Sequence, residues 1–281
     1  MDTSSSSMPS SPAPVKWISL WSSLGFLFRS PKILGTSLLL VLLTFALTWG
    51  GYMLAIGYVD GQTAGFFQQI PEAVGIWGWM KHLGWLVMKW TFYIISRIVA
   101  FYMAFILAYS LSAPGYVFLS SAAEKKHAGK AFEEDAAFTF KGIMIDILEG
   151  LKIGVLGLVV TVVALTANFI PIFGQVIVLL LYTYYSALMF VDYPTSRRRW
   201  SLGRKIGWLR RHGRDAFRLG ILAAVVSLIP FVNIFLMALL FPLLTVYVTL
   251  NFSALEQAKQ EGGAVRPARP LPDWQRPCLW P

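Results

Sequence analysis

The chain of 281 residues is poor in charge and nearly devoid of cysteine. Charged residues make up 14% of it and hydrophobic residues 56%, whereas a soluble domain has about 25% charged residues. This balance excludes an ordinary soluble domain and indicates one integral membrane unit. Cys278 has no partner for a disulfide, and the three histidines lack the spacing of metal ligands. No nucleophile with a base and no phosphate-binding loop is present, so neither an enzyme nor a bound cofactor is predicted.

Acidic and basic residues are missing from two long stretches, 153–191 and 219–255. Each stretch could hold two helices and a turn, because one bilayer-spanning helix needs only about 20 apolar residues. Both are interrupted near the middle by a similar motif, Phe169-Ile-Pro-Ile-Phe-Gly-Gln175 in the first and Leu228-Ile-Pro-Phe-Val-Asn233 in the second. Proline blocks the preceding helical turn, and Gly and Asn tolerate tight geometry. We therefore predict two repeated apolar helical hairpins, with a connection at 193–218.

Two further apolar runs predict two transmembrane helices. The first covers the uncharged residues 33–59, and the second covers residues 83–111 and is expected to end at Ser112-Ala-Pro-Gly115. Apolar residues at helical spacing predict surface helices before the first span, at 17–28, and before the first hairpin, at 140–148. The fold class is then all-α and integral to the membrane.

The domain organisation follows from these elements. Residues 17–255 are predicted to form a single membrane domain. The Ser/Pro-rich segment 1–16 and the segment 256–281 are predicted to be disordered tails.

The net charge of +10 is unevenly distributed. Basic residues precede the first predicted span and follow the second, and a cluster of basic residues, mostly arginines, occupies 197–218 between the hairpins. The connection between the first two spans holds only Lys81 against Asp60 and Glu72, so it has no net positive charge. The positive-inside rule then places both termini and the basic connection in the cytoplasm, and it explains the basic excess without nucleic-acid binding.

The motifs in the second half of the chain resemble those of the CysZ sulfate-transporter family. The resemblance lies in the two Ile-Pro motifs, with Pro171 and Pro230, and in Asp192-Tyr-Pro194 and the basic connection between them. The corner at Pro114 is similar to an Ala-Ala-Pro-Phe corner of that family. The resemblance covers residues 17–252, and the family shares its fold with eukaryotic membrane proteins of different roles.

This resemblance implies two full transmembrane helices, two half-penetrating hairpins and a homo-oligomer in the bacterial inner membrane. It also implies that the protein passes sulfate into the cytoplasm for cysteine synthesis. Reasoning from the residues does not choose between half-penetrating and spanning hairpins, because the arm 152–169 could reach about 27 Å, nearly the thickness of the bilayer core.

The hairpins contain no cation, so an anion deep in the membrane would be bound there by neutral donors. The second arm of each hairpin begins at the tip, and a helix N-terminus is an anion site. Gly174 would allow close approach of the backbone, and Gln175 and Asn233 offer amides. The alternative is that these residues only form turns.

Three basic residues are further candidates for binding the anion. Arg29 and Lys32 precede the first span, where the family pattern has adjacent basic residues implicated in sulfate binding, and flanking charges that reach lipid phosphates are the alternative. Arg97 falls inside the second predicted span, where a counter-charge for an anion or a carboxylate is expected. No acid in the other predicted spans is available to pair with it. The segment Arg197–Arg218 is predicted to bind lipid headgroups.

The sequence therefore predicts a transporter or channel for sulfate or a related oxyanion. Without an ATP site or an acidic proton relay, the flux would be passive. The alternative function is a membrane scaffold of the same fold that organises lipids or partner proteins without transporting a solute.

Overall fold

The structure, a computed structural model, describes residues 17–129, 140–229 and 232–264. Within these residues every regular element is an α-helix, and five helices are long and apolar enough to cross a membrane. The predicted all-α membrane fold is confirmed. The helices are, in chain order, α1 (Leu20–Phe28), α2 (Pro31–Gln68), α3 (Gly75–Ala128), α4 (Phe140–Ala167), α5 (Phe173–Ser196), α6 (Leu202–Arg211), α7 (Gly213–Ser227) and α8 (Val232–Ala264).

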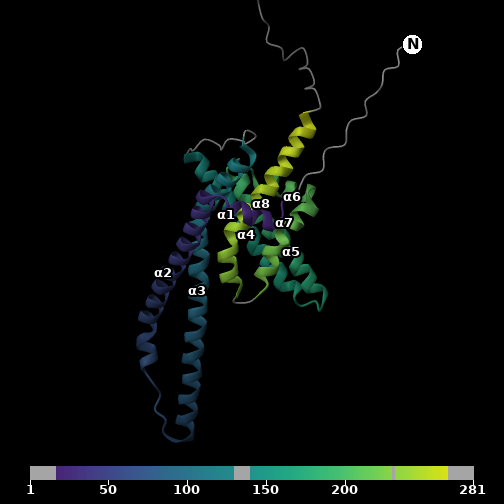
Figure 1. Ribbon diagram of the computed structural model, residues 1–281. Coiled ribbons are helices and arrows are strands. Elements are labelled where there is room, and N and C mark those ends of the chain that lie inside the picture. The colour runs from purple at the N-terminus through teal and green to yellow at the C-terminus, as the bar shows by residue number, and fades with distance from the viewer. Residues whose placement is uncertain (1–16, 130–139, 230–231, 265–281) are drawn as a thin grey trace, which may run out of the picture.

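Helices α2 and α3 form a long antiparallel hairpin that extends far beyond the rest of the molecule (Figure 1). The expected end of the second span at Ser112–Gly115 is wrong, because α3 continues through Pro114 to Ala128. A proline is tolerated in such a helix when neighbouring helices stabilise the interrupted backbone. The next residue, Gly115, serves packing, since a Cβ there would lie 2.3 Å from Leu40 Cδ2 on α2.

Helices α4 with α5 and α7 with α8 form two shorter hairpins, which reach only about as far as the middle of the α2–α3 hairpin (Figure 1). Each of the uncharged stretches 153–191 and 219–255 falls within one of these helix pairs. Helix α7 has 15 residues, so it is about 22 Å long and shorter than the roughly 30 Å bilayer core. Its partner α8 is long enough to cross the membrane, so the two arms of the second hairpin differ in length.

The predicted basic loop at 193–218 is instead mostly helical. Helix α5 runs through Pro194 to Ser196, α6 covers Leu202–Arg211, and α7 begins at Gly213. Helix α6 forms because Lys205, Trp208 and Leu209 share one buried face. The high charge of this segment hides that face in the sequence.

The predicted start of the second tail at residue 256 is also wrong, because α8 continues to Ala264. Glu256 belongs to the packed fold, since its Oε1 accepts a 2.9 Å hydrogen bond from Trp208 Nε1. Residues 1–16 and 265–281, where the rest of the predicted tails falls, lie outside the described residues.

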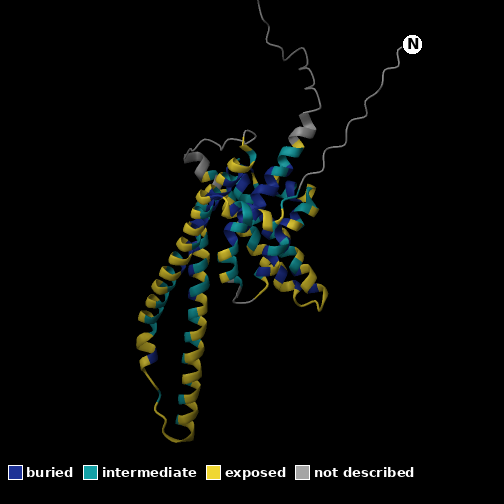
Figure 2. Cartoon of the chain, in the orientation of Figure 1, coloured by how far each residue is buried: buried dark blue, intermediate teal, exposed yellow. Residues whose placement is uncertain are grey.

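Buried residues gather where all the helices meet, at one end of the α2–α3 hairpin (Figure 2). We call this the basic end, because Lys32, Lys125, Lys126, Arg197 and Lys205 belong to it, and we call the connection at 69–74 the far end. Helix α1 is fastened there by Asn251 of α8, which accepts from Ile18 N–H at 2.9 Å and donates to Ile18 O at 3.0 Å. Most of the α2–α3 surface toward the far end is apolar and exposed, as a lipid-facing surface would be.

Candidate functional site

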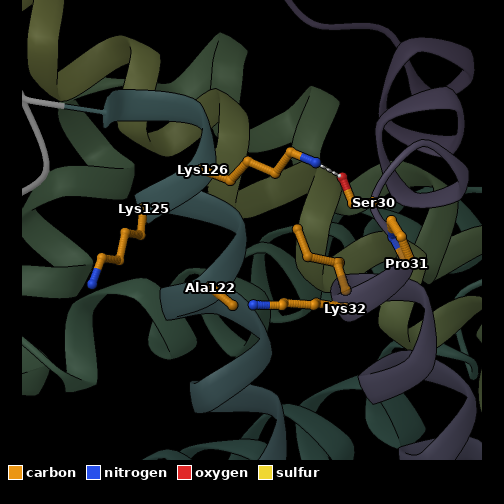
Figure 3. A pocket seen from close by; sticks show the side chains of 7 residues that line it. Ser30, Pro31, Lys32, Ala122, Lys125 and Lys126 are labelled. Carbon is orange, nitrogen blue, oxygen red and sulfur yellow. Dashed lines mark hydrogen bonds between the residues drawn. The ribbon is translucent and has the colours of Figure 1, made fainter.

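The start of α2 and the end of α3 line an open cavity of about 440 Å³ at the basic end (Figure 3). We call this cavity the lysine pocket. Lys32 and Lys126 extend toward each other's helix from opposite sides, while Lys125 points away from them. The Lys126 ammonium group donates a hydrogen bond to Ser30 Oγ. The residues that line the cavity are Ser30, Pro31, Lys32, Ile33, Ala122, Lys125 and Lys126.

The lysine pocket has the electrostatics of an anion site. Its lining residues include three lysines and no carboxylate. The first turn of α2 begins at Pro31, so the positive end of a 38-residue helix adds to the lysine charges. An oxyanion bound here would accept charge-assisted hydrogen bonds.

Sequence reasoning identified only part of this pocket. Lys32, one of the predicted anion ligands, lines the pocket. Arg29, another of them, is the C-cap residue of α1 and does not line the pocket. Lys125 and Lys126 belong to the basic residues after the second predicted span, which indicate orientation. The contact of Lys126 with Ser30 joins residues 96 positions apart, and the only sequence signal for it is that both basic groups flank spans on the same side.

Next to the pocket, Glu124 forms a buried ion cluster with Arg197 and Arg198. Its carboxylate pairs with the Arg197 guanidinium and, at 2.7 Å, with Arg198 Nη2. The three side chains are 2%, 3% and 8% exposed. This cluster joins the end of α3 to the connection that follows α5, and the sequence analysis did not identify it.

Asp192, at the end of the first uncharged stretch, pairs with a lysine of α6. Its Oδ1 accepts from Lys205 Nζ at 2.5 Å and from Ser196 Oγ at 2.9 Å. Because Arg197, Arg198 and Lys205 are used inside the fold, they are not available to lipid headgroups. Lipid binding by the other basic residues of this segment stays a prediction.

Arg97 has an acidic partner that the sequence analysis did not expect. Its Nη2 donates to both carboxylate oxygens of Asp60, at 2.9 and 2.8 Å, and its guanidinium lies 4.3 Å from the centre of the Tyr93 ring. The expectation that no acid is available was wrong, because α2 continues past residue 59 and places Asp60 opposite α3. Binding of a substrate anion by Arg97 stays a prediction.

This ion pair marks one end of the uncharged part of the α2–α3 hairpin. Residues 33–59 of α2 and 98–123 of α3 lack charge, and Asp60 and Arg97 follow directly on the far side. The matched lengths, about 40 Å by helical rise, exceed the roughly 30 Å bilayer core and allow for tilt. Arg97 therefore lies at the far boundary of the uncharged region rather than in its middle.

We expect the charges of Asp60 and Arg97 to be exchangeable. Asp60→Asn and Arg97→Gln should each lower the free energy of unfolding by roughly 1 kcal/mol, a small value because the side chains are 41% and 28% exposed. The double exchange Asp60→Arg with Arg97→Asp should recover most of this loss. Unfolding in mixed micelles measures both effects, and a double variant no more stable than the single ones would contradict the pairing.

The tips of the hairpins use their polar groups within the turns. The N–H groups of Phe173 and Gly174 donate to Pro171 O at 2.7 Å and Ile170 O at 2.9 Å. A Cβ at Gly174 would lie 2.1 Å from Ala167 O, so this glycine allows close approach of the opposite arm. Gln175 Nε2 donates to Asn168 Oδ1 at 3.0 Å.

The second tip is similar. Asn233 Nδ2 donates to Ser227 O at 3.1 Å, while Pro230 lies outside the described residues. Both tips make contacts expected of turns, although Asn233 Oδ1 is buried without a hydrogen-bond partner among the described residues. Anion binding by Gly174, Gln175 and Asn233 stays a prediction.

Comparison with known proteins agrees with this architecture. The family described as Sulfate transporter CysZ/Etoposide-induced protein 2.4 matches residues 19–238. These residues include the lysine pocket, the buried ion cluster and the tip of the first hairpin. No curated protein matches the chain. Since the match covers most of the sequence, this multi-pass membrane protein belongs to the Sulfate transporter CysZ/Etoposide-induced protein 2.4 family.

Proposed function

We propose that the protein passes sulfate or a related oxyanion through the bacterial inner membrane into the cytoplasm. The observation that carries this proposal is the lysine pocket, in which Lys32 and Lys126 approach each other's helix at the N-terminus of α2. A tetrahedral oxyanion offers acceptors in several directions, so it suits cations that approach from two helices. Membership of the family supports sulfate as the substrate.

In this proposal the basic end and both termini face the cytoplasm, as the positive-inside rule requires. The lysine pocket then receives the anion as it leaves the membrane. The flux is passive and is maintained by consumption of sulfate in the cytoplasm. The hairpins penetrate the membrane part of the way, and copies of the chain assemble as a homo-oligomer.

Uptake of labelled sulfate into liposomes tests the proposal. The wild-type protein should accumulate sulfate above protein-free liposomes, and sulfite should compete. The double variant Lys32→Ala with Lys126→Ala should reduce the initial rate by about tenfold or more, because it removes two charge-assisted donors.

The matched control is Lys81→Ala, which removes an exposed lysine near the far end and should leave the rate unchanged. No uptake by folded and inserted wild-type protein would overturn the proposal. The basic end would then be tested as the lipid- or partner-binding surface of a scaffold.

A further inference from the structure

A row of hydroxyl groups leads from the lysine pocket along the buried interface of α2 and α3. On α2 it begins with Ser37, one turn beyond the pocket residue Ile33, and continues with Thr44. On α3 it includes Tyr116, Ser112 and Tyr109. Ser37, Thr44, Ser112 and Tyr116 are 4%, 2%, 1% and 0% exposed. We call these five residues the hydroxyl row.

Three members of the row lack the hydrogen bond that a buried hydroxyl normally makes. Among the described residues, the hydroxyl oxygens of Ser37, Tyr109 and Tyr116 are buried without a hydrogen bond of regular geometry, although the Tyr116 hydroxyl lies beside Thr44. The other two members bond to each other, since Thr44 Oγ1 donates to Ser112 Oγ at 3.1 Å. Buried polar groups are nearly always paired, so three unpaired hydroxyls along one interface indicate a binding role.

Buried threonines elsewhere in the same core form hydrogen bonds with the backbone of their own helix. Thr48, Thr245 and Thr249 each donate to the carbonyl oxygen four residues earlier, at 2.7, 2.8 and 2.7 Å. Helical backbone therefore offers acceptors to buried hydroxyls in this core. The phenols of Tyr109 and Tyr116 are too long for that local bond, and their hydroxyl groups project away from their own helix.

Aromatic packing holds the two phenol rings in place. The rings of Tyr109 and Tyr116 lie 6.4 Å apart and nearly parallel, at 4°. Both also contact Phe241 of α8, at 4.9 and 4.7 Å between ring centres, and Tyr193 lies 5.8 Å from Tyr116. Groups fixed in this way act as preorganised donors, because no side-chain order has to be gained on binding.

Neutral donors suit an anion that has to pass through the membrane. Residues 33–59 and 98–123 contain no cation, so an oxyanion between the helices depends on uncharged donors. Conduction requires binding that is favourable enough to admit an ion and weak enough to release it. A lysine at this depth would be costly and would hold a dianion tightly.

We propose that the hydroxyls of Ser37, Tyr116 and Tyr109 form an intramembrane binding step for the transported oxyanion, in series with the lysine pocket. This inference rests on the proposed function. The anion exchanges part of its water shell for these hydroxyls between α2, α3 and α8. Leu40 lies between Ser37 and Thr44 in the sequence and packs over Gly115.

Removing only the three hydroxyls tests this step. The triple variant Ser37→Ala, Tyr109→Phe, Tyr116→Phe keeps the aromatic rings, and we expect it to reduce the rate of labelled sulfate uptake into liposomes by about tenfold, because it removes donors to a charged group. Equilibrium dialysis of labelled sulfate in detergent should show unchanged binding at the lysine pocket. The unfolding midpoint should stay the same or rise, because loss of an unpaired buried hydroxyl does not destabilise the fold.

The matched control is Tyr58→Phe, which removes an exposed hydroxyl and should leave the uptake rate unchanged.

The outcomes separate this inference from the proposed function. No uptake by the wild type overturns the proposed function and, with it, the binding step. Uptake by the wild type and equal uptake by the triple variant overturn the binding step alone. A triple variant that takes up sulfate more slowly and also unfolds at a lower midpoint than the wild type overturns the binding step as well. The hydroxyls would then act through packing.

Discussion

The Glu124→Gln variant is expected to lose about 3–5 kcal/mol of unfolding free energy, because it removes the carboxylate between two buried guanidinium groups. Glu124 has a side-chain exposure of 2%, and its partners Arg197 and Arg198 are almost as buried. Glutamine has nearly the same size, so the effect isolates charge from packing. The measurement is reversible unfolding in mixed micelles, followed by circular dichroism.

Two variants make this result specific. Glu72→Gln, in the exposed connection between α2 and α3, should change the free energy of unfolding by less than about 0.5 kcal/mol. Replacing Glu124, Arg197 and Arg198 together by apolar residues of similar size should recover much of the loss, because both guanidinium charges are removed together with the carboxylate. A Glu124→Gln variant as stable as wild type would show that the cluster contributes nothing to the fold.

The Gly220→Ala variant is expected to separate α7 from α5 and to cost about 3 kcal/mol or more, above the usual range for overpacking. A Cβ at this position would lie 1.9 Å from Thr183 O and 2.9 Å from Ala187 N. These are backbone atoms of α5, so no side-chain rotation relieves the contact. The unfolding midpoint and the yield of monodisperse protein measure the effect.

Gly154→Ala is the matched control, since a Cβ there meets nothing within 4 Å and the residue is also helical. Alanine is favoured over glycine inside a helix by roughly 0.5–1 kcal/mol. The control should therefore be slightly stabilised, while Gly220→Ala is destabilised. A Gly220→Ala protein as stable as the wild type or as the Gly154→Ala control would contradict the packing of α7 against α5.

Features that depend on runs of neighbouring residues follow from the sequence. The membrane class, the first span and the two hairpins rest on long uncharged stretches, and the turn near Pro171 rests on its local motif. Removal of apolar side chains from water favours each such stretch in the membrane irrespective of the segments it packs against. The stretch by itself is therefore enough to predict that it lies in the membrane. The family resemblance rests on the same local motifs.

Helix ends were less predictable, because packing competes with local signals. Pro114 and Gly115 are a usual stop signal, yet α3 passes through them and packs closely on α2. The charge of α6 predicts a loop, yet Lys205 and Trp208 are buried against other helices. In both cases contacts with distant segments outweigh the preference of a few neighbouring residues.

The site itself was decided by the tertiary structure. The Asp60–Arg97, Glu124–Arg197 and Ser30–Lys126 contacts join residues 37, 73 and 96 positions apart. The sequence alone determined that the protein lies in a membrane with its charge gathered on one side. Only the fold decided which charges pair and which remain for an anion, because the strength of a charge interaction depends on distance and burial in space.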